Sequence, residues 1–360
     1  MLIKDKNTSS PSKQYFNEIR QKRLVLMVLV CLLFLVAIVS LLLGSINFSL
    51  SDLFKILSKQ ADPTTQMIFY NIRLPRVVTA IVVGAMLAMS GLIMQCVMAN
   101  PLASPSTLGV AQGAAFGAAI GIIIFGGGVL STTSSPIAID NPYIVTLSAF
   151  FFSILTTIII LLISRFSIYI EASGLVLVGI ALSAVFSAGS MLLQYFADDV
   201  QLGAVVFWTY GNVGGTSWQE ILILAIVFFL AFIFFKIHQW DYFALEAGTE
   251  IAKNVGVNTR TLTLLGMTIC SLVTAIAVSF VGVISFIGLI SPHLMRRFIG
   301  NSYNYLIPAT AIGGSIILLF SDTVGRLVMA PTILPVGAIT SLLGGPMFIF
   351  ILVKRIRQND

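Results

Sequence analysis

Residues 245–256, which read LEAGTEIAKNVG, form a polar segment between two long hydrophobic blocks. The blocks cover residues 221–235 and 262–290, and neither contains a charged side chain. Unpaired polar groups are costly in hydrocarbon. The polar segment must therefore project into water between two membrane-spanning helices.

The polar segment is predicted to form one short helix. Its apolar residues Ala247, Ile251 and Val255 repeat at the spacing of one helix face. Gly248 weakens this helix, and Gly256 can end it, because glycine readily takes the left-handed conformation found after helix C-termini. A short amphipathic helix held at a membrane surface is suited to contact another protein.

The composition is that of an integral membrane protein. Of the 360 residues, 58% are hydrophobic and only 9% are charged, whereas a soluble domain has about 25% charged residues. At about 20 residues per span plus connections, such a chain has room for nine or ten helices. Its apolar runs are continuous rather than alternating, which excludes a membrane β-barrel. We predict an all-α polytopic membrane protein with about ten transmembrane helices.

The predicted spans divide the chain into a tail and one membrane domain. Residues 1–23 are expected to be a disordered cytoplasmic tail, residues 24–357 a single transmembrane domain, and residues 50–59 a short helix outside the membrane. Glycines and a proline inside the block 262–297 predict a break followed by a short second helix, so nine or ten spans stay open. The spans are placed near 24–43, 75–98, 106–126, 142–163, 173–196, 219–236, 262–281, 283–297, 306–325 and 334–353.

The basic residues predict the orientation in the membrane. With ten alternating spans and a cytoplasmic N-terminus, the 20 Lys and Arg residues divide into fifteen inside and five outside. Cytoplasmic loops carry such an excess, so we predict a multi-pass protein of the cell membrane with both termini in the cytoplasm. The polar segment 245–256 is then cytoplasmic. The five outside residues are Lys55, Lys59, Arg73, Arg76 and Arg326.

The chain shows no sign of chemistry of its own. No charged side chain lies in the middle of a predicted span, although such charges usually mark ion-coupled transporters. The sequence has no HExxH motif and no Walker-type phosphate loop, and its three cysteines lack CxxC spacing. We predict no enzyme activity, no metal site, no cofactor and no nucleic-acid partner. Energy for any transport would come from another protein, and the polar segment is a surface on which such a protein could act.

Several short motifs follow one another along the membrane part of the chain. They are RLPR (73–76), NPLA (100–103), LGV (108–110), GTEIAKNVG (248–256), FIGLI (286–290) with Pro292, His293 and Arg296, Asp322 with Arg326, and LPVG (334–337). In this order and spacing they resemble the FecCD family of permeases, the membrane subunits of ABC importers for iron–siderophore complexes, haem and vitamin B12. The resemblance runs from about residue 73 to residue 354.

The resemblance implies a complete importer around this chain. It implies the type II ABC importer permease fold, with two permease subunits, identical or different, around a central path in the bilayer. Two cytoplasmic ATPases and an external substrate-binding protein would complete the assembly. A ferric siderophore is the expected cargo, and haem and cobalamin stay open. The chain is then a transport subunit, with ATP hydrolysis on its partners.

The resemblance also implies roles for three sets of residues. Arg73, Arg76 and Arg326 match arginines that pair with glutamates of the binding protein, although an i, i+4 pair between Asp322 and Arg326 competes with this role. The polar segment resembles the coupling helix that docks on the ATPase, with Glu246, Gly248, Glu250, Ala252, Lys253 and Gly256 as its coupling residues. The cytoplasmic gate would comprise Asn100, Leu102 and Ser173, unless Asn100 only caps its turn.

Two functions of other classes stay open at this point. A sodium-coupled secondary transporter could bind its ion through backbone and hydroxyl oxygens, and its uptake would not need an ATPase. A non-transporting membrane docking protein would use residues 245–256 to bind a partner, and vesicles holding the full complex would show no substrate flux.

Overall fold

The computed structural model of the protein describes residues 11–44, 48–127, 142–166, 172–330 and 332–359. Within these residues every regular element is a helix. In chain order the elements are α1 (Pro11–Leu42), α2 (Leu50–Leu57), α3 (Pro63–Ile68), the π-helix η1 (Phe69–Arg73), α4 (Leu74–Val97), α5 (Val110–Ile123), α6 (Pro142–Phe166), α7 (Ala172–Tyr195), α8 (Asp199–Thr209), α9 (Trp218–Ile237), α10 (Gln239–Ala247), α11 (Thr249–Asn254), α12 (Thr259–Val281), α13 (Ile287–Ile299), α14 (Tyr303–Leu327) and α15 (Val336–Asn359).

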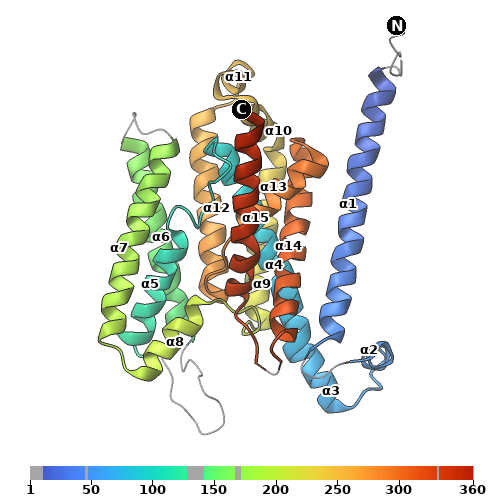
Figure 1. Cartoon of the computed structure of the whole chain (residues 1–360), viewed down its shortest axis with the longest axis vertical. Helices are drawn as coiled ribbons and strands as arrows, with labels where there is room; N and C mark the ends of the chain where they lie inside the picture. The colour runs from blue at the N-terminus through green and yellow to red at the C-terminus, as the bar shows by residue number, and fades with distance from the viewer. Residues whose placement is uncertain (1–10, 45–47, 128–141, 167–171, 331, 360) are drawn as a thin grey trace.

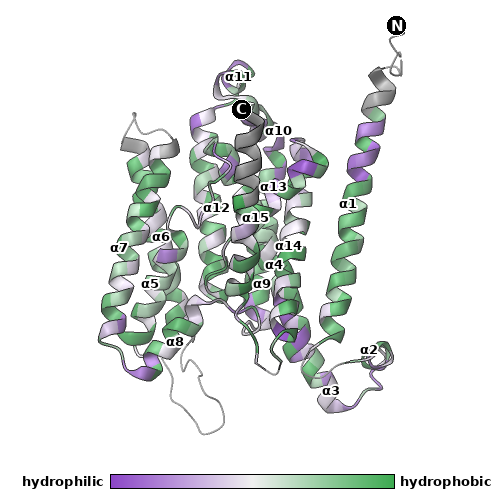
Figure 2. Cartoon of the chain, in the orientation of Figure 1, coloured by the Kyte–Doolittle hydropathy of each residue, from purple (hydrophilic) through white to green (hydrophobic). Residues whose placement is uncertain are grey.

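The predicted all-α membrane fold is confirmed. Each predicted span matches one helix, in the order α1, α4, α5, α6, α7, α9, α12, α13, α14 and α15. In the described part of the chain, seven helices are long and apolar enough to cross a membrane, and α5 is a shorter apolar helix. Hydrophobic residues fill the middle of the bundle, and hydrophilic residues gather toward its ends (Figure 2).

The two ends of the bundle carry different elements. The start of α1, the short helix α11 and the end of α15 lie at one end, which we call the α11 end (Figure 1). Helices α2, α3 and α8 lie at the opposite end, which we call the α3 end. The polar segment, the start of α1 and the end of α15 therefore share one side, as an even number of spans requires.

Helix α4 is at the centre of the bundle and packs against α9, α12, α13 and α14. Small residues let its backbone approach its neighbours closely, as is common in membrane helices. A Cβ atom at Gly84 would lie 2.5 Å from the carbonyl oxygen of Gly314 in α14. A Cβ atom at Gly91 would lie 1.8 Å from the carbonyl oxygen of Gly288 in α13. The core is thus built on direct backbone contact between helices.

We expect Gly91→Ala to lower the thermal unfolding midpoint of the purified protein clearly. The added methyl group would overlap the backbone of Gly288, and overpacking of this kind costs about 1–3 kcal/mol or more. Gly215→Ala is the control, because its Cβ atom would meet only Asn212 Nδ2 at 3.8 Å. Equal midpoints for the two variants in detergent would contradict the close α4–α13 contact.

The predicted break after α12 is confirmed. Helix α12 ends at Val281 and α13 begins at Ile287, with positive φ angles of 74° at Gly282 and 67° at Phe286. The backbone N–H of Asn212 donates to the carbonyl of Val281 at 2.7 Å. Non-helical backbone at membrane depth is tolerated where protein encloses it, and the buried Ile284 lies within this break.

One expectation needs correction, and one helix was not expected. Helix α1 begins at Pro11, so part of the tail predicted to be disordered continues the first helix, whereas residues 1–10 lie outside the described residues. The connection between the fifth and sixth predicted spans contains α8, whose start is fixed by a capping box of Asp198 and Gln201. The expected short helix near residues 50–59 is confirmed as α2.

Candidate functional site

The polar segment is two helices and not one. Gly248 separates α10 from α11 with φ 135° and ψ 147°, a backbone conformation that is essentially restricted to glycine. The prediction of one continuous helix over 245–256 is therefore wrong. Glu246 and Glu250 belong to different helices and do not share a face.

Helix α11 presents both charged and apolar side chains at the α11 end. The side chains of Glu250 and Lys253 are 82% and 54% exposed, and Lys253 Nζ donates to Glu250 Oε1 at 2.9 Å. Ile251 and Val255 are exposed as well. Ala252 is buried, and Gly256 follows the helix with φ 88°, as expected of a glycine after a helix C-terminus. This outer face of α11 is a compact surface suited to a protein partner.

Glu246 points into the protein instead. Its carboxylate accepts hydrogen bonds from two guanidinium nitrogens of Arg296, in the last turn of α13. The hydroxyl of Tyr303, the first residue of α14, donates to Glu246 Oε2 at 2.7 Å. The acceptor atoms of Glu246 are thus engaged inside the subunit, and its part in coupling to an ATPase stays a prediction.

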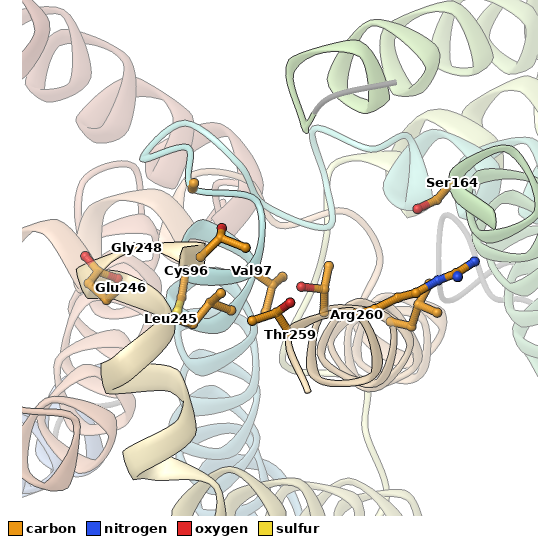
Figure 3. Close-up of a pocket in the computed structure, with 12 residues that line it drawn as sticks. Cys96, Val97, Ser164, Leu245, Glu246, Gly248, Thr259 and Arg260 are labelled. Atoms are coloured by element: carbon orange, nitrogen blue, oxygen red, sulfur yellow. The ribbon is translucent and has the colours of Figure 1, made fainter. Parts of the chain in front are cut away.

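A cavity of about 280 Å³ lies beside the junction of α10 and α11 (Figure 3). Leu245, Glu246 and Gly248 line one side of it, and Cys96 and Val97 at the end of α4 line another. The start of α12 completes it, where the side chain of Arg260 extends toward Ser164 of α6. The junction is therefore not close-packed against α4 and α12.

Of the three predicted gate residues, Asn100 and Leu102 lie together in one turn. Asn100 Oδ1 accepts a hydrogen bond from the backbone N–H of Leu102 at 2.9 Å, so Asn100 does form the turn that was its alternative role. The side chain of Leu102 is partly exposed next to this turn. Ser173 lies in the first turn of α7, and its side chain is outside the described part of the structure. A gate at these residues stays a prediction.

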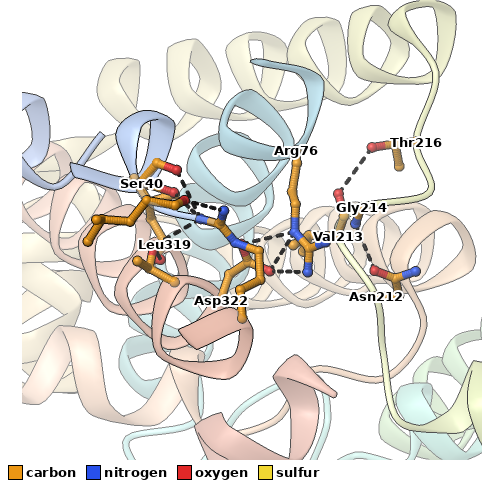
Figure 4. A network of polar contacts seen from close by, with 11 residues as sticks. Ser40, Arg76, Asn212, Val213, Gly214, Thr216, Leu319 and Asp322 are labelled. Atoms are coloured by element: carbon orange, nitrogen blue, oxygen red, sulfur yellow. Dashed lines mark hydrogen bonds and ion pairs between the residues drawn. The ribbon is translucent and has the colours of Figure 1, made fainter. Parts of the chain in front are cut away.

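The three predicted docking arginines lie close together. Arg76 and Arg326 bind one carboxylate, that of Asp322. Arg76 donates to Asp322 through Nε at 2.9 Å and Nη2 at 2.8 Å, and Arg326 Nε donates to the other carboxylate oxygen at 3.1 Å (Figure 4). The Asp322 side chain is 1% exposed. The Asp322–Arg326 pair within α14 is therefore formed, as the competing interpretation expected.

Arg326 and Arg73 also satisfy carbonyl groups at the C-terminal end of α1. Arg326 Nη1 donates to the carbonyl of Leu43 at 2.9 Å, and Arg73 Nη1 donates to that of Leu41 at 2.6 Å. The last carbonyls of a helix lack partners within the helix and attract cations. The guanidinium of Arg73 also lies 3.9 Å from the ring centre of Phe48. These contacts tie α1 to η1 and α14.

The arginines are consequently not free on an exposed rim. Arg73 and Arg326 are only 7% and 8% exposed. Their guanidinium groups are engaged within the subunit. A direct contact with a binding protein stays a prediction, and the structure adds a second role in holding the α3 end together.

The fold and its two polar ends define a multi-pass membrane protein: apolar helices fill the bundle, and a short exposed helix marks one end. The chain belongs to the FecCD transport family, whose model matches residues 7–354. Members of this family are permease subunits of ABC transporters.

Individual relatives cover nearly the whole chain. A Methanocaldococcus jannaschii protein described as an ABC transporter permease is 44% identical over 331 residues, covering 92% of this chain and 94% of that protein. The hemin transport system permease protein of Yersinia pestis is 36% identical over 340 residues, covering 94% and 98%. A solved structure described as an inward-facing metal-chelate type ABC transporter is 32% identical with a TM-score of 0.78, covering 92% and 99%.

Proposed function

We propose that this chain is the permease subunit of an ABC importer that passes a ferric siderophore from an external binding protein to the cytoplasm. The family match over residues 7–354 carries this proposal. The related hemin permease supports an iron chelate as the class of cargo. Haem and cobalamin-type chelates are the other candidates.

The α11 end faces the cytoplasm in this proposal. The excess of Lys and Arg predicted on this side supports that orientation. The exposed face of α11, with Glu250, Ile251, Lys253 and Val255, is the surface that docks on an ATPase. Two ATPases then act on two permease subunits, which are either identical copies of this chain or this chain and a relative.

The α3 end faces outward and receives the binding protein. Arg73, Arg76 and Arg326 serve this docking mainly by fixing the relative positions of α1, α4 and α14. Arg76, whose side chain is 11% exposed, is the arginine best placed to contact a carboxylate of a partner as well. Such a contact would orient the partner more than it would add affinity.

Uptake by the complete importer in lipid vesicles tests this function. The permease is reconstituted with its ATPases, and the binding protein is supplied with radioactive iron bound to siderophores, with haem or with labelled cobalamin. ATP-dependent accumulation of a ferric siderophore is the expected result. Uptake that needs a sodium gradient but no ATPase would replace the proposal with a secondary transporter. Absence of flux for every cargo would favour a docking protein.

A further inference from the structure

The last turn of α10 is fastened to two other helices at one point. Glu246 accepts hydrogen bonds from Arg296 of α13 and from Tyr303 of α14. The side chains of Glu246 and Arg296 are only 18% and 23% exposed. A charge pair that is largely shielded from water holds its geometry better than an exposed pair. We call these three residues the α10 joint.

Packing around the α10 joint strengthens the attachment of α10 to α14. The rings of Tyr242 and Tyr303 are stacked with centres 6.3 Å apart, and both side chains are fully buried. Burial raises the pKa of the Tyr242 phenol far above its ordinary value, so this ring stays neutral. Lys236, at the end of α9, donates to the carbonyl of Asn304 at 2.6 Å.

The opposite side of the junction is loosely held. Gly248 lets the chain turn between α10 and α11, and the 280 Å³ cavity separates this turn from the ends of α4 and α12 (Figure 3). Helix α11 packs mainly on α10 and α12. A displacement of α11 would therefore meet little resistance on the cavity side and would be carried by α10 into its joint.

Helices α13 and α14 can move together. The hydroxyl of Ser291 in α13 donates to the carbonyl of Thr310 in α14 at 2.8 Å, and the two helices pack along each other. The break between Val281 and Ile287 separates α13 from α12. Helix α14 then runs from Tyr303 at the α10 joint to the Asp322 cluster at the α3 end.

We propose that the α10 joint transmits movement of α11 to α13 and α14, so that Glu246 is a positioning residue and not an ATPase contact. This inference rests on the proposed function. Its physical basis is that one carboxylate links three helices, while the cavity leaves room for α11 to shift together with α10, on which it packs. Movement at the α11 end would thereby reach the α3 end through a single helix, α14.

The ratio of ATP hydrolysed to cargo imported tests the joint in the complete importer. In Glu246→Ala, ATPases still dock through α11 and hydrolyse ATP, but import falls. The ratio is expected to rise about tenfold, the size of a typical coupling between two sites. Tyr303→Phe keeps the ring stacking and removes one hydrogen bond, so its ratio should rise less. Glu250→Ala is the comparison variant, since it should weaken ATPase docking and lower hydrolysis and import together.

Exchanging the two charges of the α10 joint distinguishes a loss of transmitted movement from a loss of protein stability. The double variant Glu246→Arg with Arg296→Glu should lower the ratio again relative to either single variant, whereas the thermal midpoint reports folding independently. If hydrolysis and import fall in parallel in Glu246→Ala and Tyr303→Phe, or if the ratio of ATP hydrolysed to cargo imported is unchanged in both, the α10 joint does not transmit movement. If the unaltered complex shows no ATP-driven import, the proposed function has failed instead. If the unaltered complex imports its cargo normally, the results for the variants test the α10 joint alone.

Discussion

Lys253→Pro is expected to abolish ATP-driven uptake while the protein stays folded in the membrane. Lys253 lies in the last turn of α11 (Thr249–Asn254). There proline removes a backbone hydrogen bond and clashes with the preceding turn, at a cost of about 3 kcal/mol. Because α11 has only six residues, this cost is enough to unfold it. An ATPase would then find no rigid surface to push against.

Two further variants distinguish the contribution of the α11 helix from that of the Lys253 side chain. Thr249→Pro places proline at the first helical position, where no N–H is needed, and should leave most of the uptake intact. Lys253→Ala removes the charge but keeps the helix, and should have an intermediate effect. Vesicle uptake is measured for all three together with the amount of ATPase that copurifies. Full uptake by Lys253→Pro would show that α11 does not transmit force.

Asp322→Asn is expected to destabilise the protein by about 3–5 kcal/mol, the usual cost of breaking a buried ion pair. Asp322 accepts hydrogen bonds from both Arg76 and Arg326 within a site that is almost closed to water. The substitution leaves two guanidinium groups facing a neutral amide. We expect a large drop in the thermal midpoint of the purified protein in detergent.

Asp52→Asn is the matched control at the same end of the molecule. Asp52 is a partly exposed carboxylate in the capping box at the start of α2, and its loss should change the midpoint little. A triple variant, Arg76→Met with Asp322→Leu and Arg326→Met, replaces all three charges by apolar groups and should recover part of the lost stability. If Asp322→Asn keeps the original midpoint and binds the binding protein more tightly, the arginines serve docking and not the fold.

The spans could be predicted from the sequence because each is encoded locally. An apolar run of about 20 residues is sufficient to indicate a membrane helix, and the glycines after Val281 marked the break before α13. The start of α1 was misplaced because its first turns are polar, and polarity gives no measure of helix length outside the membrane. The resemblance in motifs supplied the family, which the comparisons confirm.

The contacts of the two polar sites could not be predicted in the same way. Glu246 is bound by residues 50 and 57 positions further along the chain, and Arg76 by a residue 246 positions away. Helical spacing reveals only pairs within one helix, Asp322 with Arg326 and Glu250 with Lys253. Arg296 stood in one of the recognised motifs without a role, and nothing in the sequence pointed to Tyr303.

The division of the polar segment at Gly248 shows a different limit. A glycine in a helical pattern is compatible either with a weakened helix or with a break. Only the backbone angles of Gly248 decide between them. That decision changes the function of Glu246, since the break leaves Glu250 on the outer helix and Glu246 in the inner one.

The side of the membrane on which α11 lies decides whether this helix can receive force from ATP hydrolysis. Val255, 66% exposed after the end of α11, is replaced by cysteine in a Cys31→Ser background, since Cys96 and Cys270 are buried. A maleimide that cannot cross membranes is applied to intact cells and to inside-out vesicles. We predict labelling only in the vesicles, with protection when the ATPase is bound. Labelling of intact cells would place α11 outside and contradict its role in receiving force from ATP hydrolysis.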